Sequence, residues 1–312
     1  MTADELLARV EAGGLIGGPA PLVAMLSGGR DSVCVLDLAV RARGATAVTA
    51  LHVNYGLREE AGEDERHCIE LSRELGVRVE VERPRRPEGA GNLQAWAREV
   101  RYAAAARLAE EVDARIVTGH TADDQVETIL YRLASSPSRR ALLGMRPRDG
   151  RLARPLLIAT REETTAYCEE RGLAWRDDAS NDEADYKRNR LRRELIPELE
   201  RIHPAAKANV LRTAALLREE AELLDSLVDA ELAGADGAPA GTIAKARFAD
   251  LHPALRRLVL QRLADEAAGR PVPGAARFAE QVAGLTRGGS TLDLGSGVRA
   301  VLEGGQIRAQ QG

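Results

Sequence analysis

Two short polar stretches of the chain carry residue types that could bind and activate a phosphorylated ligand. The first, SGGRDS, spans Ser27–Ser32 and follows an apolar run. Its glycines permit a sharp turn and a close backbone approach, and the amides that open the following helix lack internal partners, so an anion is the expected ligand. Ser27 and Ser32 would add hydroxyl donors, and Asp31 would suit a magnesium ion beside phosphates. The plainer alternative is an ordinary turn in which Asp31 or Ser32 caps the helix.

The second stretch, GHTADDQVET (Gly119–Thr128), places three carboxylates close together. Thr121 and Asp124 have the spacing of a capping box, and acids in a first turn complement the helix dipole, but this explains only one or two of the three acids. Asp124 and Glu127 are i,i+3 neighbours and project together. Two such carboxylates beside a phosphate site would hold a metal ion or an ammonium group. His120 is an equal candidate for a catalytic residue and for a local hydrogen-bonding group.

Three further residues are weaker candidates for contacts to a phosphorylated ligand. Arg30 belongs to the first stretch, and His52 lies at the end of the second apolar run. Arg98 lies on a later helix, where it could reach a phosphate or equally be a surface charge.

Alternating strand and helix patterns would position these residues. Apolar runs predict strands at Leu22–Leu26, Ala47–Val53, Val77–Val81 and Arg115–Thr118. Helical periodicity predicts helices at Asp31–Arg43, Gly62–Leu75, Leu93–Glu111 and Asp123–Leu133. This repeat predicts an α/β fold with a parallel sheet covered by helices on both faces. Ligands of such sheets bind beyond the carboxyl ends of the strands, where both polar stretches would lie.

The length of 312 residues exceeds what one core usually supports, so two domains are expected. We place a catalytic domain at 1–200 and a mostly helical domain, ending in short strands, at 201–312. The stretch SSPSRRALLGMRPRDG reads as a long connection. No apolar run could span a bilayer and no secretion signal is evident, so a cytoplasmic protein without a membrane partner is expected. The three cysteines are far apart, which suits a reducing compartment and disfavours a metal cluster.

Arginines are clustered although the net charge is −4. For either cluster alone, a solvated face is the plainer interpretation. Two clusters flanking a candidate active site favour a polyanionic partner, because arginine makes bidentate contacts with phosphate and stacks on bases. The residues singled out for nucleic-acid binding are Arg139, Arg140, Arg188, Arg190 and Arg192.

The order of these motifs resembles that of one enzyme family. SGGRDS alone resembles the PP-loop of ATP pyrophosphatases, which cleave ATP between its α- and β-phosphates. Followed by HVNYGLRE, AREVRY, GHTADDQVET, RPLL and DDASNDEADYKRNRLR, it resembles the tRNA(Ile)-lysidine synthetases over roughly the first two-thirds of the chain. The rest of the chain is similar to the small helical tRNA-binding domain of short members.

The resemblance implies an ATP-dependent, AMP-forming carbon–nitrogen ligase that uses Mg²⁺. Its substrates would be free L-lysine and the tRNA(Ile) with a CAU anticodon, whose wobble cytidine is adenylated and then converted to lysidine. Carried over by position, the residues that would hold pyrophosphate and magnesium are Ser27, Gly28, Gly29, Asp31 and Ser32. Arg98 and His120 would lie beside the nucleotide, and Asp124 and Glu127 would bind lysine, with the base among them left open.

Two positions depart from the family, since Thr121 and Tyr55 stand where it usually has histidine. Three rivals remain: a tRNA thiolase, an ammonia-using relative and a non-catalytic ATP-dependent tRNA-binding module. Paired cysteines, which thiolases generally need, are missing from the sequence. The sequence leaves open the oligomeric state, a homodimer included, and the way in which methionine tRNA is rejected.

Overall fold

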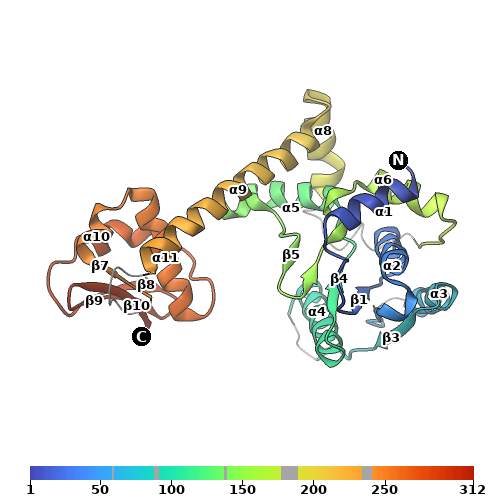
Figure 1. The fold of residues 1–312 in the computed structure, drawn as a ribbon, viewed down its shortest axis with the longest axis horizontal. Helices are drawn as coiled ribbons and strands as arrows, with labels where there is room; N and C mark the ends of the chain where they lie inside the picture. Colours follow the sequence, from blue (N-terminus) through green and yellow to red (C-terminus); the bar gives the residue numbers. More distant parts are fainter. Residues whose placement is uncertain (58–59, 88–90, 137–138, 177–188, 234–240) are drawn as a thin grey trace. The chain divides into compact units, whose positions relative to one another are not determined.

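The computed structural model describes residues 1–57, 60–87, 91–136, 139–176, 189–233 and 241–312, with the side chain of Arg139 excepted. The chain divides into two compact units, Met1–Ala215 and Leu216–Gly312 (Figure 1). The division lies inside helix α9 (Ala206–Leu232) rather than near residue 200. Because one continuous helix contributes residues to both units, no change in amino-acid composition marks the boundary between them.

A six-stranded sheet forms the centre of the first unit, in the order β3-β2-β1-β4-β6-β5. The four strands expected from the sequence are present and parallel: β1 (Leu22–Met25), β2 (Val48–Val53), β3 (Arg78–Glu82) and β4 (Arg115–Val117). Because β1 pairs with both β2 and β4, the chain crosses from one side of β1 to the other, and the loops after β1 and β4 lie at this crossing.

Two strands of the sheet were not expected. Strand β6 (Leu152–Ala153) pairs in parallel with β4, and β5 (Arg148–Asp149) pairs antiparallel with β6. The predicted long connection therefore contains strand β5 and a 3-10 turn, η2 (Arg139–Leu143). Strands of two residues are too short to show an alternating pattern, so periodicity could not reveal them.

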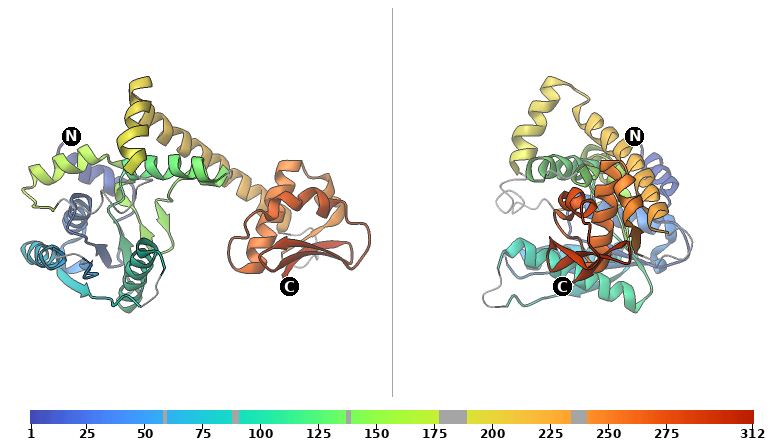
Figure 2. Two further views of the ribbon diagram at one scale, coloured as in Figure 1. Left: turned by 180° about the vertical axis from the view of Figure 1, so that it is seen from behind. Right: turned by 90° about the vertical axis from the view of Figure 1, so that its left-hand side faces the viewer.

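Helices cover both faces of the sheet, as predicted (Figures 1 and 2). Leu22 and Ala24 of β1 belong to a core with the helices α1 (Ala3–Ala12), α2 (Arg30–Arg43), α3 (Ala61–Glu74) and α6 (Arg161–Glu170). Val23 and Met25 point to the other face and pack against α4 (Leu93–Glu111). Helix α5 (Ala122–Ser135) follows β4 directly. This alternation along β1 is the pattern of a strand buried on both sides.

The first unit ends in a π-helical turn, η5 (Leu191–Leu195), which continues into α8 (Ile196–Ile202) and the start of α9. Single π-helical turns are rare in proteins overall, and many of those that occur lie at functional sites. No helix within the described ranges is long and apolar enough to cross a membrane.

The second unit joins helices to a four-stranded antiparallel sheet. Its strands, in the order β7-β10-β9-β8, are β7 (Thr242–Ala244), β10 (Gln306–Gln311), β9 (Val298–Glu303) and β8 (Ser290–Gly295). Besides the last part of α9, its described α-helices are α10 (Lys245–Asp250), α11 (Pro253–Ala268) and α12 (Ala279–Ala283). Phe248, Leu260 and Leu294 are fully buried in a core of its own. Helices α10 and α11 are separate because Pro253 starts a new helix with His252 as its N-cap.

Candidate active site

The two polar stretches meet where the strand order reverses. Gly119, after β4, has no room for a side chain, because a Cβ atom there would lie 2.5 Å from the carbonyl oxygen of Asp31 and 2.9 Å from the amide nitrogen of Ser32. Only glycine allows the end of β4 to approach the first turn of α2 this closely. The shared location of SGGRDS and GHTADDQVET at one sheet edge is confirmed.

The SGGRDS loop is shaped by its own hydroxyl groups. The Ser32 hydroxyl donates to the Gly29 carbonyl at 2.7 Å and accepts from the Ser27 amide at 3.1 Å. Gly28 has a φ of +88°, which favours glycine. Helix α2 begins with Gly29 as N-cap and without a side-chain capping bond, so neither Asp31 nor Ser32 caps it. The amides of Ser32 and Val33 donate to the Gly29 carbonyl, so an external anion would meet only the amides that precede them at the start of α2.

The Asp31 carboxylate lies beside this loop and is held from two sides. Its Oδ1 accepts from the Thr164 hydroxyl at 2.6 Å and from Arg30 Nε at 3.0 Å. Among the described residues no three acids, histidines or cysteines gather as a metal centre. One carboxylate next to a phosphate loop nevertheless fits Mg²⁺, which commonly takes one or two protein carboxylates and completes its shell with substrate phosphates and water.

Two histidines lie beside the SGGRDS loop. His52 is buried, and its Nδ1 donates to the carbonyl of Leu26, the residue before the loop, at 2.9 Å. Burial lowers the pKa of His52. His67, which the sequence analysis did not single out, lies 3.4 Å from where a Cβ on Gly28 would be. Its buried Nε2 has no hydrogen-bond partner among the residues described, and no motif in the sequence points to it.

His120 is a neutral group beside several arginines. Its Nδ1 lies 2.8 Å from the hydroxyl of Thr118. Burial lowers the pKa of His120 to about 4, with Asp124 opposing the shift and Arg154, Arg101 and Arg98 adding to it. The structure thus brings Arg98 and His120 to the same region. The imidazole is uncharged at pH 7, so it can exchange hydrogen bonds with a ligand without adding charge.

Tyr55 and Thr121, the two departures from the family's histidines, have structural roles. The Tyr55 hydroxyl donates to the Ala97 carbonyl at 2.9 Å, and its ring packs edge-on against Trp96. It joins the segment after β2 to α4. Thr121 is fully buried and caps α5 in a capping box with Asp124, which confirms the spacing argument.

The three acids of α5 are already paired with cations. Asp123 accepts from the backbone amide of Arg161 at 2.8 Å and from Lys207 Nζ at 3.0 Å. Burial raises the pKa of Asp123, but these hydrogen bonds lower it overall. The Arg161 guanidinium contacts both Asp124 and, at 2.8 Å, Glu127. The acids expected to hold a metal ion or an ammonium group therefore lie close together, but cations of the same chain already pair with them.

Arg161 and Thr164, on the first turn of α6, were missed by the sequence analysis. Thr164 contacts Asp31, and Arg161 contacts the acids of α5, so this one turn connects both motifs. The signal available was weak. Arg161 is the first residue of a helix, where a positive charge opposes the helix dipole unless acids neutralise it.

The arginines proposed for nucleic-acid binding have different surroundings. Arg192 Nε pairs with Glu127 at 2.8 Å and so belongs to the acidic pocket. Arg190, exposed on the same segment, pairs with Glu194 at 3.2 Å. Arg140 is exposed on η2. Arg188 and the side chain of Arg139 lie outside the described residues.

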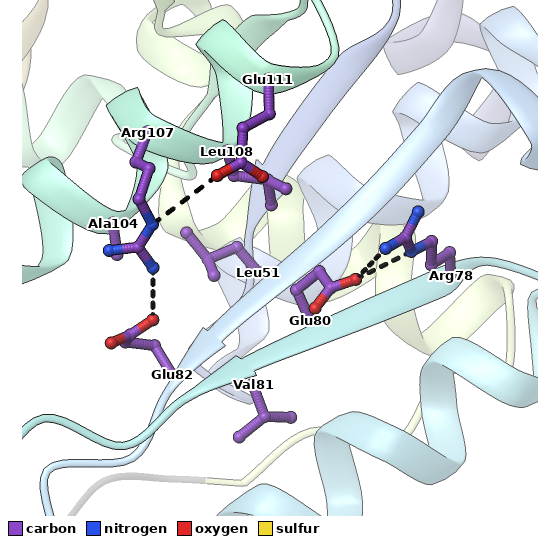
Figure 3. Close-up of a pocket in the computed structure, with 9 residues that line it drawn as sticks. All are labelled: Leu51, Arg78, Glu80, Val81, Glu82, Ala104, Arg107, Leu108 and Glu111. Atoms are coloured by element: carbon purple, nitrogen blue, oxygen red, sulfur yellow. Dashed lines mark hydrogen bonds and ion pairs between the residues drawn. The ribbon is translucent and has the colours of Figure 1, made fainter.

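A separate surface pocket lies between β3 and α4 (Figure 3). Its charged lining is paired internally, since Arg107 contacts Glu82 and Glu111, and Arg78 contacts Glu80. None of the residues predicted for the site lines it.

Residues 15–199 match the model of the PP-loop domain family. The chain is 42% identical over 257 residues to a tRNA(Ile)-lysidine synthase of Thermus thermophilus, an alignment that covers 80% of this chain and 50% of that protein. It is 37% identical to a tRNA(Ile)-lysidine synthase of Symbiobacterium thermophilum, over 92% of this chain and 64% of that protein. The chain thus spans between half and two thirds of the length of these relatives.

The U34-tRNA thiolase NcsA from Methanococcus maripaludis has a similar fold, with a TM-score of 0.59 at 17% identity, covering 69% of this chain and 78% of that one. At this identity the likeness concerns the fold alone. The family model covers more than half of the sequence and includes both loops that meet beside β1. The chain belongs to the PP-loop domain family.

Proposed function

We propose that the protein is a tRNA(Ile)-lysidine synthetase, which joins free L-lysine to the wobble cytidine of the CAU-anticodon tRNA(Ile) at the expense of ATP. The observation that carries this proposal is the connection of a phosphate-type loop to an acidic pocket through one turn of α6. Similarity to tRNA(Ile)-lysidine synthases at 37–42% identity supports it.

In the first half-reaction, the phosphates of ATP would lie on the Gly28–Gly29 turn and the first amides of α2. Asp31 would hold Mg²⁺, which when bound would neutralise part of the negative charge on the pyrophosphate that leaves. The carbonyl oxygen of the cytidine ring attacks the α-phosphorus, and the bond from that phosphorus to pyrophosphate breaks. Neutral His120 and the positive Arg98 would flank the nucleotide.

In the second half-reaction, the ε-amine of lysine attacks the activated ring carbon and AMP leaves. The amine is protonated in water, and at pH 7 removing the proton costs roughly 4–5 kcal/mol, from a reference pKa of about 10.4. Asp124 and Glu127 would bind the ammonium group, and one of them would accept its proton. Lysine must first displace a cation that already pairs with these acids.

The rival chemistry of a thiolase finds little support in the cysteines. The chain has three, and Cys34, Cys68 and Cys168 are all buried and free. Burial raises the pKa of the Cys68 thiol to about 12, which opposes its use as a nucleophile.

The direct test is an assay with ATP, Mg²⁺, CAU-anticodon tRNA(Ile) and one nucleophile at a time. We expect the tRNA to gain the mass of lysine minus water, with one AMP and one pyrophosphate released per lysine joined. Omission of either tRNA or lysine should abolish product formation. A tRNA transcript with uridine at the wobble position is the matched control and should gain no mass. Turnover with sulfide or ammonia but not with lysine would refute the proposal.

A further inference from the structure

We propose that Arg161 binds the α-carboxylate of the amine substrate and thereby restricts the pocket to free amino acids with a second amine. This inference rests on the proposed function, since it concerns how the same pocket selects lysine.

Arg161 is anchored by its backbone while its side chain remains within reach of solvent. Its amide donates to Asp123 at 2.8 Å, which fixes the start of α6 against α5. Its side chain is 20% exposed and contacts Asp124, 24% exposed, and the nearly buried Glu127. These two contacts use two of the five N–H donors of a guanidinium. The other donors can meet a carboxylate in the planar, bidentate geometry that arginine favours.

The charges of Arg161 and its two acidic partners are opposite in sign to those of free lysine. Asp124, Glu127 and Arg161 together present two negative charges and one positive charge. Free lysine has two ammonium groups and one carboxylate. A diamine without the carboxylate would leave Arg161 without its expected partner, and an amino acid with one amine would leave one of the acids without an added cation. Charge pattern alone therefore favours a diamino acid.

The second arginine in the pocket is the one that can leave. Arg192 pairs with Glu127 through Nε, is 43% exposed and lies on the π-helical turn η5. Arg161 is more buried and is tied to Asp123 through its backbone. With Arg192 present the group is neutral, whereas without it the net charge is −1 and attracts the net charge of +1 on lysine. Arg161 thus remains as the carboxylate partner.

The alternative is a purely structural ion pair between α6 and α5. A structural role predicts that losing the guanidinium impairs every amine substrate equally. Recognition of the carboxylate predicts an effect on lysine and little effect on cadaverine (1,5-diaminopentane), which retains both amines and lacks only the carboxylate. The two substrates therefore separate the two roles.

The experiment measures kcat and KM for lysine and for cadaverine with the full-length wild type, Arg161→Gln and Arg161→Lys. The wild type should strongly prefer lysine. In Arg161→Gln the KM for lysine should rise roughly 10- to 100-fold, the range expected for loss of a charged hydrogen bond. The kcat/KM for cadaverine should change less than threefold, so that the preference collapses. Arg161→Lys should restore part of it.

Arg171→Gln is the matched control, because Arg171 is the C-cap of α6 and pairs at 3.0 Å with the buried Asp37. It should reduce stability without changing the preference for lysine. Far-ultraviolet circular dichroism and thermal unfolding check that the variants fold, and Arg161→Lys carries the comparison if Arg161→Gln fails that check. Equal losses for both amines in the Arg161 variants, or a wild type indifferent to the carboxylate, would overturn the inference alone. A wild type that joins neither amine to tRNA would instead overturn the proposed function and the inference with it.

Discussion

The acids of the candidate site are each held by an opposite charge. Asp31 pairs with Arg30, Asp124 with Arg161, and Glu127 with both Arg161 and Arg192. An acid as buried as Glu127 would be strongly destabilised if it lost its partners. On the proposed function, a cationic substrate would exchange with a cation already present, and its affinity would be the difference between the two pairings. This favours substrates whose charge pattern matches the pocket in full.

His120 provides a pH-dependent test at the residue scale. Burial lowers its pKa from 6.5 to about 4, so the unfolded chain binds this proton in a range where the folded chain does not. Stability should therefore be fully present above pH 6.5 and fall as the pH drops towards 4, by roughly 1–3 kcal/mol from this group. Urea unfolding at several pH values should show this slope, and His120→Gln should lack that part of it.

The exposed His203, at the C-cap of α8, is a suitable control for loss of an imidazole. His203→Gln should keep the pH dependence of the wild type. With five histidines in the chain, NMR can follow the His120 ring directly. A midpoint at or above 6.5 would contradict the burial argument.

Among the elements, helix α6 does most to assemble the site, because its first turn contacts Asp31 at the start of α2 and Asp124 at the start of α5. The helices α2 and α5, which carry the two polar stretches, were predicted from the sequence, as were the four central strands. Local patterns carry that information, since strand alternation, capping and glycine turns depend on neighbours in the sequence. The loop at Ser27–Ser32 and the capping box at Thr121 were found for the same reason.

Pairings between distant residues could not be predicted in this way. The acids that contact Arg161 lie 34 and 37 residues before it, and the contact between Glu127 and Arg192 spans 65 residues. Asp124 and Glu127 were consequently expected to be available to a metal ion or an ammonium group. The spacing of neighbouring residues in the sequence does not reveal which cation of the chain will pair with them.

The segment around η5 gives a prediction at the element scale. On the proposal that Arg190 and Arg192 each contact a tRNA phosphate, the double variant Arg190→Gln/Arg192→Gln should bind CAU-anticodon tRNA(Ile) more weakly than the wild type. A plot of log affinity against log salt should become shallower by roughly 1–2 units. Arg201→Gln, an exposed arginine on the adjacent α8 that pairs with Glu198, should retain the wild-type slope. An unchanged slope in the double variant would contradict tRNA binding by these arginines and would indicate an ordinary solvated face.

At the scale of the molecule, each unit has its own hydrophobic core. The cores of the first unit surround β1 on both faces, and that of the second contains Phe248, Leu260 and Leu294. Both tryptophans, Trp96 and Trp175, belong to the first unit, which also contains the nucleotide loop. Tryptophan fluorescence therefore reports on one unit, whereas far-ultraviolet circular dichroism reports on both.

Separate cores predict separate unfolding transitions, and ATP should distinguish them. With ATP–Mg²⁺ at 100 times its Kd, the fluorescence midpoint should rise by roughly 5–10 °C, since such binding contributes about 2.7 kcal/mol to a domain of this size. The dichroism transition of the second unit should not move. Leu294→Ala, which opens a cavity in the second core, should have the converse effect and lower only the dichroism transition. If both probes gave one coincident transition that ATP and Leu294→Ala shifted equally, the two units would unfold as one cooperative body, and nucleotide binding would stabilise the helical and antiparallel part as much as the parallel sheet.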